Sequence, residues 1–457
     1  MSGNFAIFET ILPDKGIMIQ KNTLPIDHEV LTSVLKQMDI SDISCSTIRQ
    51  AGSIARALES HTETEFLHLE MGIPGLPPAK VGVEAEKAAL DAGVASIYPN
   101  MLGTPELKTQ ASRFIKAFLD VDQNSEYCIP TVGSMQGSFT AFLLCAQADP
   151  RKDTILFIDP GFPVQRSQTK ILGIKSDSFD IYEYRGEKLR AKLESYLSKG
   201  NIAALVYSSP NNPAWFNLTD EELRIIGELA SKHDTIVIED LAYMCMDFRK
   251  PLGKPYQPPF QPTVARYTDN YILLMSASKI FSYAGQRIAI IAISDAIYRR
   301  EYPALKERYN MTRFGDAYVL GVLYGASSGT SHSAQCALAE MFRAAADGDF
   351  DFVGEASEYA RRAALTKKSF IDNGFHIVYE KDGDEPVSDG FFYTVGYEGL
   401  SSTELMGELM RYGICSIALS MTGSRQDGVR ICISQLNRPE QFDLLEARLA
   451  LFASDHK

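Results

Sequence analysis

One lysine stands out by its surroundings. Between residues 276 and 287 the chain reads SASKIFSYAGQR, which places Lys279 among serines, a glycine and an arginine. A lysine that is buried or held near other cations can lose its proton and attack a carbonyl carbon to form a Schiff base. The hydroxyls of Ser276 and Ser278 and the planar guanidinium of Arg287 suit a phosphate group close by. The alternative is an ordinary surface lysine in a solvated loop.

The segments on either side of Lys279 are strongly apolar. Residues 271–275 (YILLM) predict a buried strand, and residues 287–293 (RIAIIAI) predict another. The stretch between them is too polar to form core and contains a glycine, so we expect Lys279 on a loop between two rigid strands.

A strand-helix-strand unit is predicted upstream. Residues 202–207 (IAALVY) predict a strand and residues 235–239 (TIVIE) predict the next one. Thr219 and Glu222 have the spacing of a capping box, which begins a helix that runs to about Lys232. Polar residues follow both strands, at the edge where open α/β sheets bind ligands.

An anion site is predicted at the start of a helix. In TVGSMQGSFTAFLLCAQ (131–147), Gly133 ends a short strand, and the segment from Ser134 and Met135 to Gly137 opens an apolar helix. The free amides and the positive dipole end of such a helix attract a phosphate. Glycines at this spacing also serve close packing alone, so the pattern by itself is weak.

Taken together, these segments resemble the fold-type-I pyridoxal phosphate enzymes, the class I/II aminotransferases. The pattern S-x-S-K, with G-x-R ending at Arg287, resembles their cofactor-lysine segment, and other motifs follow in the family order from about Gly72 to Ser434. The resemblance implies an α/β fold like that of aspartate aminotransferase, with a mostly parallel sheet in a large domain and a smaller α+β domain. The cofactor that it implies is pyridoxal 5'-phosphate.

The resemblance also implies roles for the residues that would contact the cofactor ring. Lys279 would hold the cofactor, and Asn212 and Tyr243 would hydrogen-bond its phenolic oxygen. Asp240 would pair with the protonated ring nitrogen, because a positive ring withdraws electrons from the substrate. Taken alone, an aspartate at a strand end is more often a cap or a turn residue. The catalytic residues implied in this way are Lys279, Asp240 and Tyr243.

Further positions complete the implied site. Phe162, in the turn DPGFPV, would stack on the ring, although such a residue also serves as a loop plug; Asp159 is expected only to stabilise the turn. Tyr98 would reach the phosphate of the neighbouring subunit. The cofactor-binding set is Ser134, Met135, Phe162, Asn212, Asp240, Tyr243, Ser276, Ser278, Lys279, Arg287 and Tyr98.

The substrate side of the implied site contains Gly72, Asn212 and Arg430. Arg430 is alone among apolar residues in GVRICIS (428–434), and in the family this arginine clamps the substrate carboxylate. An arginine in an apolar strand is costly without an anionic partner. The alternative partner is a protein carboxylate in a buried ion pair. No metal site is predicted.

The resemblance has one clear departure. After Asn212 and Pro213 the family usually has Thr-Gly, whereas this chain has Ala214 and then Trp215, its only tryptophan. The expected domains are residues 1–84, a segment joining the small domain; residues 85–320, the large cofactor-binding domain; and residues 321–457, the small domain. The first seventy residues match no motif, but helices are expected at 27–38 and 46–59.

Composition limits the class of protein. The chain has 457 residues, 45% hydrophobic and 23% charged residues, which is ample for two packed domains. Its net charge of -13 argues against a nucleic-acid or anionic membrane partner. Seven scattered cysteines indicate reduced thiols, and the first sixteen residues lack a signal-peptide pattern, so a cytoplasmic location is expected.

The resemblance implies a homodimeric enzyme, with active sites shared between its subunits, that moves an amino group from an L-amino acid to a 2-oxo acid. Carbon-sulfur lyases, amino-acid decarboxylases and cyclopropane-forming synthases use the same constellation, and the sequence does not separate them. A cofactor-binding sensor without turnover is disfavoured, because no basic DNA-binding module precedes the fold. The identity of the substrate side chain stays open.

Overall fold

Apolar side chains on both faces build the largest sheet of the structure. In β3 (Thr154–Asp159), Ile155 and Phe157 join one buried cluster, whereas Leu156 and Ile158 join the other. Successive side chains of a strand point to opposite faces, so both faces of this sheet are covered. The computed structural model describes residues 22–457 of the chain.

Seven strands form this sheet in the order β2-β8-β7-β6-β5-β3-β4. β8 is antiparallel to β2 and β7, and the other neighbouring pairs are parallel. The predicted strands are confirmed within one or two residues. Besides β3, the strands of the sheet are β2 (Cys128–Thr131), β4 (Lys175–Asp180), which was not predicted, β5 (Ile202–Ser208), β6 (Ile236–Asp240), β7 (Tyr271–Ser276) and β8 (Ala289–Ile293).

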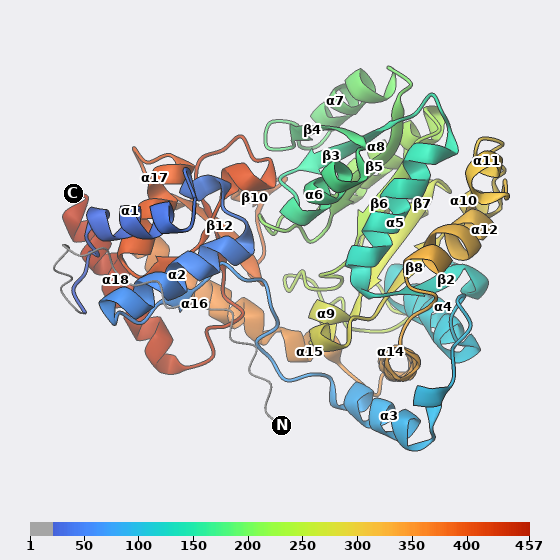
Figure 1. Cartoon of the computed structure of the whole chain (residues 1–457), viewed down its shortest axis with the longest axis horizontal. Helices are drawn as coiled ribbons and strands as arrows, with labels where there is room; N and C mark the ends of the chain where they lie inside the picture. Colours follow the sequence, from blue (N-terminus) through green and yellow to red (C-terminus); the bar gives the residue numbers. More distant parts are fainter. Residues whose placement is uncertain (1–21) are drawn as a thin grey trace.

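Helices cover this sheet, and together they form the large lobe (Figure 1). The predicted capping box of Thr219 and Glu222 begins α8 (Asp220–Lys232), as the sequence indicates. α14 (His332–Asp347) packs against α3 (Lys80–Asp91) and α4 (Pro105–Leu119). The other helices of this lobe include α5 (Gly133–Ala148), α6 (Pro163–Leu172), α7 (Lys188–Leu197), α9 (Ala277–Ile280), α10 (Asp295–Arg299) and α11 (Leu305–Tyr309).

A second, antiparallel sheet organises the small lobe, in the order β14-β15-β12-β9. Its strands are β14 (Ile417–Ala418), β15 (Val429–Cys432), β12 (Phe392–Gly396) and β9 (His376–Ile377). Helices α16 (Glu358–Asp372), α17 (Ser402–Arg411) and α18 (Pro439–Asp455) pack around them.

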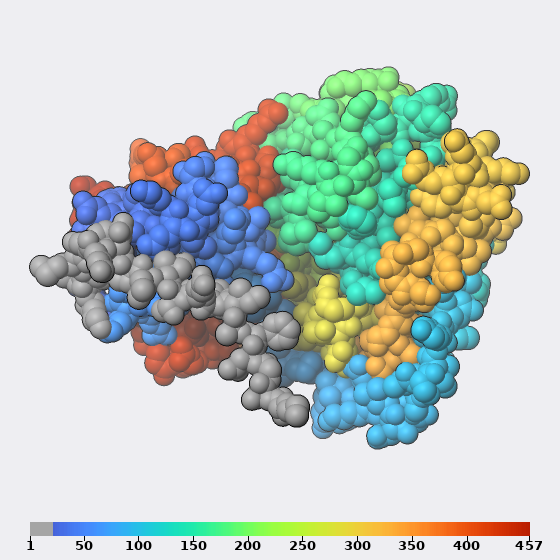
Figure 2. Space-filling model, viewed as in Figure 1, coloured from blue at the N-terminus to red at the C-terminus, as the bar shows by residue number. Residues whose placement is uncertain are grey.

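The N-terminal helices lie on this small lobe. α1 (His28–Gln37) and α2 (Ile48–Thr62) match the two predicted helices, and β1 (Leu67–His68) pairs in parallel with β13 (Ile414–Cys415). Figure 2 shows the blue N-terminal residues lying against the orange and red C-terminal ones. The first sixteen residues, which carry the signal-peptide expectation, lie outside the described part. The domain boundaries given above stay predictions.

A short hairpin links the two lobes. β10 (Lys381–Asp382) and β11 (Glu385–Pro386) pair antiparallel and extend from the small lobe toward the large one (Figure 1). Among residues 22–457, no helix is long and apolar enough to span a membrane.

Candidate active site

Lys279 follows directly on the central strand β7. The prediction of a loop is wrong in detail, because residues 277–280 form the short helix α9. Ser276 begins this helix: its hydroxyl accepts a hydrogen bond from the N–H of Ser278 at 3.2 Å. This cap turns the chain into a helical turn immediately after the strand, so the lysine is fixed more firmly than a loop would fix it.

The amine of Lys279 is buried with few partners. Its Nζ donates to the carbonyl oxygen of Gly72, and it lies 5.5 Å from the ring centroid of Phe391. Burial, together with the nearby cations Arg430 and Arg287, lowers the pKa of Lys279 to about 8 against an opposing effect of Cys432. The neutral, nucleophilic amine is therefore accessible near physiological pH.

Asp240 is the last residue of β6 and is buried at the same edge of the sheet. Its Oδ2 accepts from Nε2 of Gln165 at 2.9 Å, and its Oδ1 accepts from the N–H of Ala242 at 3.1 Å. Burial raises the pKa of Asp240 to about 6, although these two donors act to lower it. None of the ion pairs among residues 22–457 includes Asp240. It is a buried carboxylate that no cation of the described residues neutralises.

The start of α5 forms a cradle of glycine and arginine. Gly133 has φ +68°, and a Cβ placed there would lie 2.4 Å from Nη2 of Arg287. The absence of a side chain thus lets the guanidinium lie across the first turn, where Ser134 and Met135 follow. Val132 supplies no side-chain cap to this helix. Unused N–H groups and a nearby guanidinium together make a phosphate site.

The predicted aromatic residues differ in exposure. Phe162 is half-buried at the residue before α6. Asp159 ends β3 and pairs with Arg166, so it has the structural partner expected of a turn residue. Tyr98 is 90% exposed and lines a hollow of about 550 Å³ with Thr330 and Ser331.

Arg430 lies on β15 and is 1% exposed. Its Nη1 donates to Oδ1 of Asn212 at 3.1 Å, its Nη2 donates to the backbone carbonyl of Glu70, and its Nε has no partner. None of the ion pairs among the described residues includes Arg430, so a protein carboxylate does not take the place of an anionic ligand. Burial lowers the pKa of Arg430.

Glu70 accepts from Arg430 through its backbone carbonyl, but its side-chain carboxylate pairs with another residue. The side-chain carboxylate of Glu70 contacts Nδ1 of His68 at 3.0 Å and raises the pKa of that histidine. Cys415, His68 and Glu70 have potential metal-ligand atoms within 4.8 Å of one another. The His68–Glu70 ion pair accounts for this grouping, and the expectation of no metal stays a prediction.

Aromatic rings enclose the space between Asn212 and Lys279. The ring of Tyr243 is buried, with its centroid 5.5 Å from those of Phe391 and Phe392 and 5.2 Å from that of Trp215. Burial raises the pKa of Tyr243 well above its usual value, so its hydroxyl stays protonated and can donate. A Cβ at Gly72 would lie 2.7 Å from Cζ of Phe392, so only glycine fits there.

Three contributors were missed by the sequence interpretation: Gln165, Phe391 and Phe392. Gln165 lies three residues after Phe162 in the first turn of α6, and this spacing was the one signal for its contact with Asp240. The Phe391–Phe392 pair has no comparable signal, because its place beside Lys279 depends on how the two lobes meet.

The chain is similar to known proteins over most of its length. The model of the family described as aminotransferase class I and II matches residues 64–447. A probable aspartate aminotransferase of Methanocaldococcus jannaschii is 25% identical over 348 residues, which cover 72% of this chain and 88% of the relative. An LL-diaminopimelate aminotransferase of Gloeobacter violaceus is 27% identical over 231 residues, 50% of this chain and 56% of the relative.

Solved structures share the fold. The aspartate aminotransferase from Rhizobium meliloti superposes with a TM-score of 0.72 at 17% identity, covering 91% of this chain and 97% of that one. The Thermus thermophilus aspartate aminotransferase with maleate gives 0.69 at 20% identity, covering 89% and 96%. At these identities the structures establish the arrangement of strands and helices, and the expected fold class is confirmed.

Proposed function

Because the chain belongs to the aminotransferase class I and II family, whose enzymes use pyridoxal 5'-phosphate, we propose that it moves an amino group between an L-amino acid and a 2-oxo acid. The interpretation of the sequence as a pyridoxal phosphate-dependent aminotransferase is confirmed by the family match and the named relatives. The lyase, decarboxylase and sensor alternatives are not favoured by them. The residue roles below are our proposal.

One observation carries the assignment of roles: three charged groups at one site, of which Asp240 and Arg430 are buried, lack a counter-charge among the described residues. Lys279 has only a carbonyl partner, Asp240 has neutral donors, and Arg430 has an amide and a carbonyl. Buried charges are normally paired. An amino acid and a pyridinium cofactor supply the missing charges, a carboxylate for Arg430 and a ring cation for Asp240.

The cradle at α5 fits the phosphate of this cofactor. A Cβ at Gly133 would collide with Arg287, so the missing side chain lets the guanidinium lie against the start of α5, and Ser276 and Ser278 belong to the segment that leads to Arg287. We propose that these residues, with Ser134 and Met135 in the first turn, hold the phosphate. Phe162 would cover the ring, and Asn212 and Tyr243 would hydrogen-bond its phenolic oxygen.

When bound, the cofactor supplies an aldehyde that accepts the amino group and a ring that withdraws electrons. The remaining work falls to the chain. Nζ of Lys279, with its pKa near 8, is suited to take the proton from the substrate α-carbon and to return it. Arg430 would bind the substrate carboxylate in bidentate fashion and so fix the α-carbon within reach of the lysine.

We also propose that the protein is a homodimer in which each active site contains residues of both chains. Tyr98 of one chain would reach the phosphate bound by the other. The 90% exposure of its ring supports this. Inactive Tyr98→Phe and Lys279→Ala proteins should regain part of their activity when unfolded and reassembled together, because a mixed dimer can contain one intact site. A fully active monomer in sedimentation would exclude the shared site.

The assignment of Lys279 is tested by reduction. Borohydride treatment of the purified yellow protein should fix the cofactor on the peptide that contains Lys279, and mass mapping to another lysine would refute the assignment. A panel of amino acids, aspartate included, assayed with 2-oxoglutarate and pyruvate for keto acid, ammonia and carbon dioxide, separates transamination from elimination and decarboxylation.

A further inference from the structure

The segment that follows Asn212 is packed against the small lobe. Trp215 is fully buried, and a Cβ at Gly390 of the small lobe would lie 2.0 Å from its Cε2 atom. The ring of Phe216 lies 6.2 Å from that of Tyr379, again in the small lobe. The bulky residues that replace the usual Thr-Gly therefore make this segment a contact surface between the lobes.

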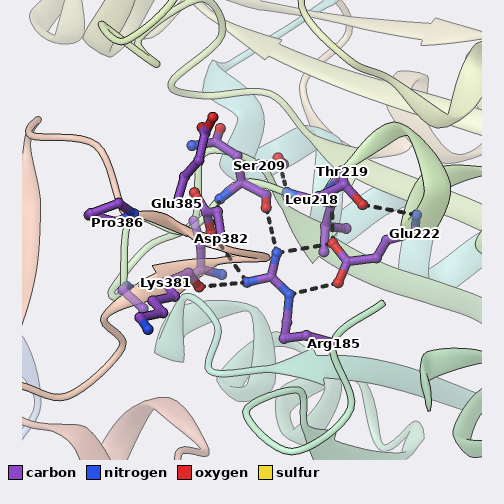
Figure 3. Close-up of polar contacts among 12 residues, drawn as sticks. Arg185, Ser209, Leu218, Thr219, Glu222, Lys381, Asp382, Glu385 and Pro386 are labelled. Carbon is purple, nitrogen blue, oxygen red and sulfur yellow. Dashed lines mark hydrogen bonds and ion pairs between the residues drawn. The ribbon is translucent and has the colours of Figure 1, made fainter. Parts of the chain in front are cut away.

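Asp382 holds the same segment from the hairpin β10–β11. Its side chain is 5% exposed, and its Oδ1 accepts from the backbone N–H of Asn217 at 3.0 Å and from Nη1 of Arg185 at 3.2 Å. Its Oδ2 accepts from Nη2 of Arg249 at 2.9 Å. Figure 3 shows the carboxylate of Asp382 reaching Arg185 across the boundary between the lobes.

Arg185 is fully satisfied. Its Nε and Nη2 donate to the two oxygens of Glu222 at 2.7 and 3.0 Å, and its Nη2 also donates to the carbonyl of Asn217 at 2.8 Å. Its Nη1 donates to Asp382 and to the carbonyl of Lys381, each at 3.2 Å. All five N–H donors of a guanidinium are thus in use (Figure 3).

Arg249 makes the second connection. It donates to both oxygens of Asp247 at 2.8 and 2.7 Å, to Asp382, and to the carbonyl of Pro386 at 2.6 Å. Asp247 lies four residues after Tyr243. The interlobe joint, as we call Arg185, Glu222, Asp247, Arg249 and Asp382, therefore ties the hairpin to the two segments that begin at Asn212 and at Tyr243.

We propose that Asp382 is a positioning residue that sets Asn212 against Arg430, a role that rests on the proposed function of those two residues. Asn212 and Arg430 come from different lobes and touch at 3.1 Å, so their geometry depends on how the lobes are held together. A buried carboxylate between two guanidinium groups is strongly directional. Without its charge, Arg185 and Arg249 lose the anion that lies between them, and the segment from Asn212 to Asn217 loses one of its anchors.

The test compares Asp382→Asn with Asp384→Asn, an exposed aspartate at the tip of the same hairpin. Trp215 is the only tryptophan in the chain, so its fluorescence reports on the anchored segment without reference to activity. In Asp382→Asn we expect a red-shifted emission, roughly twofold greater acrylamide quenching, and a KM for the amino acid raised about tenfold with a smaller fall in kcat. Asp384→Asn should match the native protein in all three.

Arg249→Lys provides a second variant in case Asp382→Asn folds poorly. It keeps the charge but loses the fork, so it should move the fluorescence and KM in the same direction and by less. Native fluorescence and kinetics in both variants would overturn the proposal, as would a lowered Tm with normal KM, which is the result of a purely structural joint. If the native protein transaminates no amino acid, the proposed function fails on its own, and the fluorescence still decides whether Asp382 anchors the segment.

Discussion

Two arginines near the lobe boundary have opposite surroundings. Arg185 in the interlobe joint donates all five of its side-chain N–H groups. Three of these hydrogen bonds go to the carboxylates of Glu222 and Asp382, and two go to backbone carbonyls. Arg430 in the candidate site is more deeply buried, yet it has one amide and one carbonyl as partners and an Nε without any. The fully paired arginine joins the two lobes, whereas we propose that the under-paired one binds an anion from solution.

The same contrast separates two aspartates. Asp382 and Asp240 are both buried, and burial raises the pKa of each. Asp382 lies between two guanidinium groups, whereas Asp240 receives only an amide N–H from Gln165 and a backbone N–H. An unpaired buried charge destabilises the folded protein. Such a group is therefore expected where a ligand supplies its counter-charge.

The largest effect is expected from Asp240→Ala. This variant should fold and retain much of its cofactor binding, while kcat falls about a thousandfold, roughly 4 kcal/mol of transition-state stabilisation. The reason is that the ring nitrogen loses the anion that keeps it protonated. Steady-state kinetics with Asp382→Asn as the comparison tests the contrast directly. A fall of less than tenfold for Asp240→Ala would contradict the electron-withdrawing role.

Arg430→Lys comes next. An ammonium cannot reproduce the planar fork, so kcat/KM should fall about a hundredfold for every amino acid, mainly through KM. The Tm should change little, because no protein carboxylate is left unpaired. Amines without a carboxylate should be poor substrates for the native enzyme and should lose little more in the variant. A large loss of Tm with normal kinetics would instead identify Arg430 as structural.

Arg185→Lys should behave in the reverse way. The lysine leaves Glu222 and Asp382 short of donors, and the free energy of unfolding should fall by roughly 2 kcal/mol. KM should change less than threefold, since Asp382 keeps Arg249 and the N–H of Asn217. Urea denaturation and kinetics on one preparation give both quantities. Lost activity with native stability in this variant would remove the distinction between the two arginines.

The sequence predicts most of the large sheet because most of its strands are short apolar runs that end in polar residues; the polar edge strand β4 is the exception. Lys279, Asp240 and Asn212 each follow such a run, so the fold places them at one edge, and this placement follows from the order of apolar and polar residues alone. Their roles remain predictions. The helical turn at Lys279 was missed, because the cap supplied by Ser276 is a local hydrogen bond within a segment that is polar throughout.

The joint could not be predicted in the same way. Asp382 belongs to the polar stretch KDGDE, and nothing in that stretch distinguishes it from the exposed Asp384 two residues later. Its burial comes from Arg185 and Arg249, which are far away in the chain and meet it only when the lobes pack. Contacts between lobes have no local period or motif, so a sequence pattern predicts a solvated turn there.

The smallest effect concerns the pH dependence of Lys279 in protein freed of cofactor. Burial lowers its pKa from the usual 10.5 to about 8. At pH 7 about one amine in ten is then neutral, against about one in three thousand for an ordinary lysine. Because only the neutral amine attacks the aldehyde, the rate of cofactor attachment should rise about tenfold per unit up to pH 8 and level off above it. Stopped-flow absorbance between pH 6 and 10 measures this profile, provided that the protein remains folded.

Arg430→Gln removes a neighbouring cation, so the inflection should move to higher pH, whereas Arg185→Lys, which keeps its charge in the joint, should leave the inflection where it is. A rate that keeps rising to pH 10 in the native protein would show that Lys279 is as solvated as a surface lysine, and its difference from the paired charges of the joint would disappear.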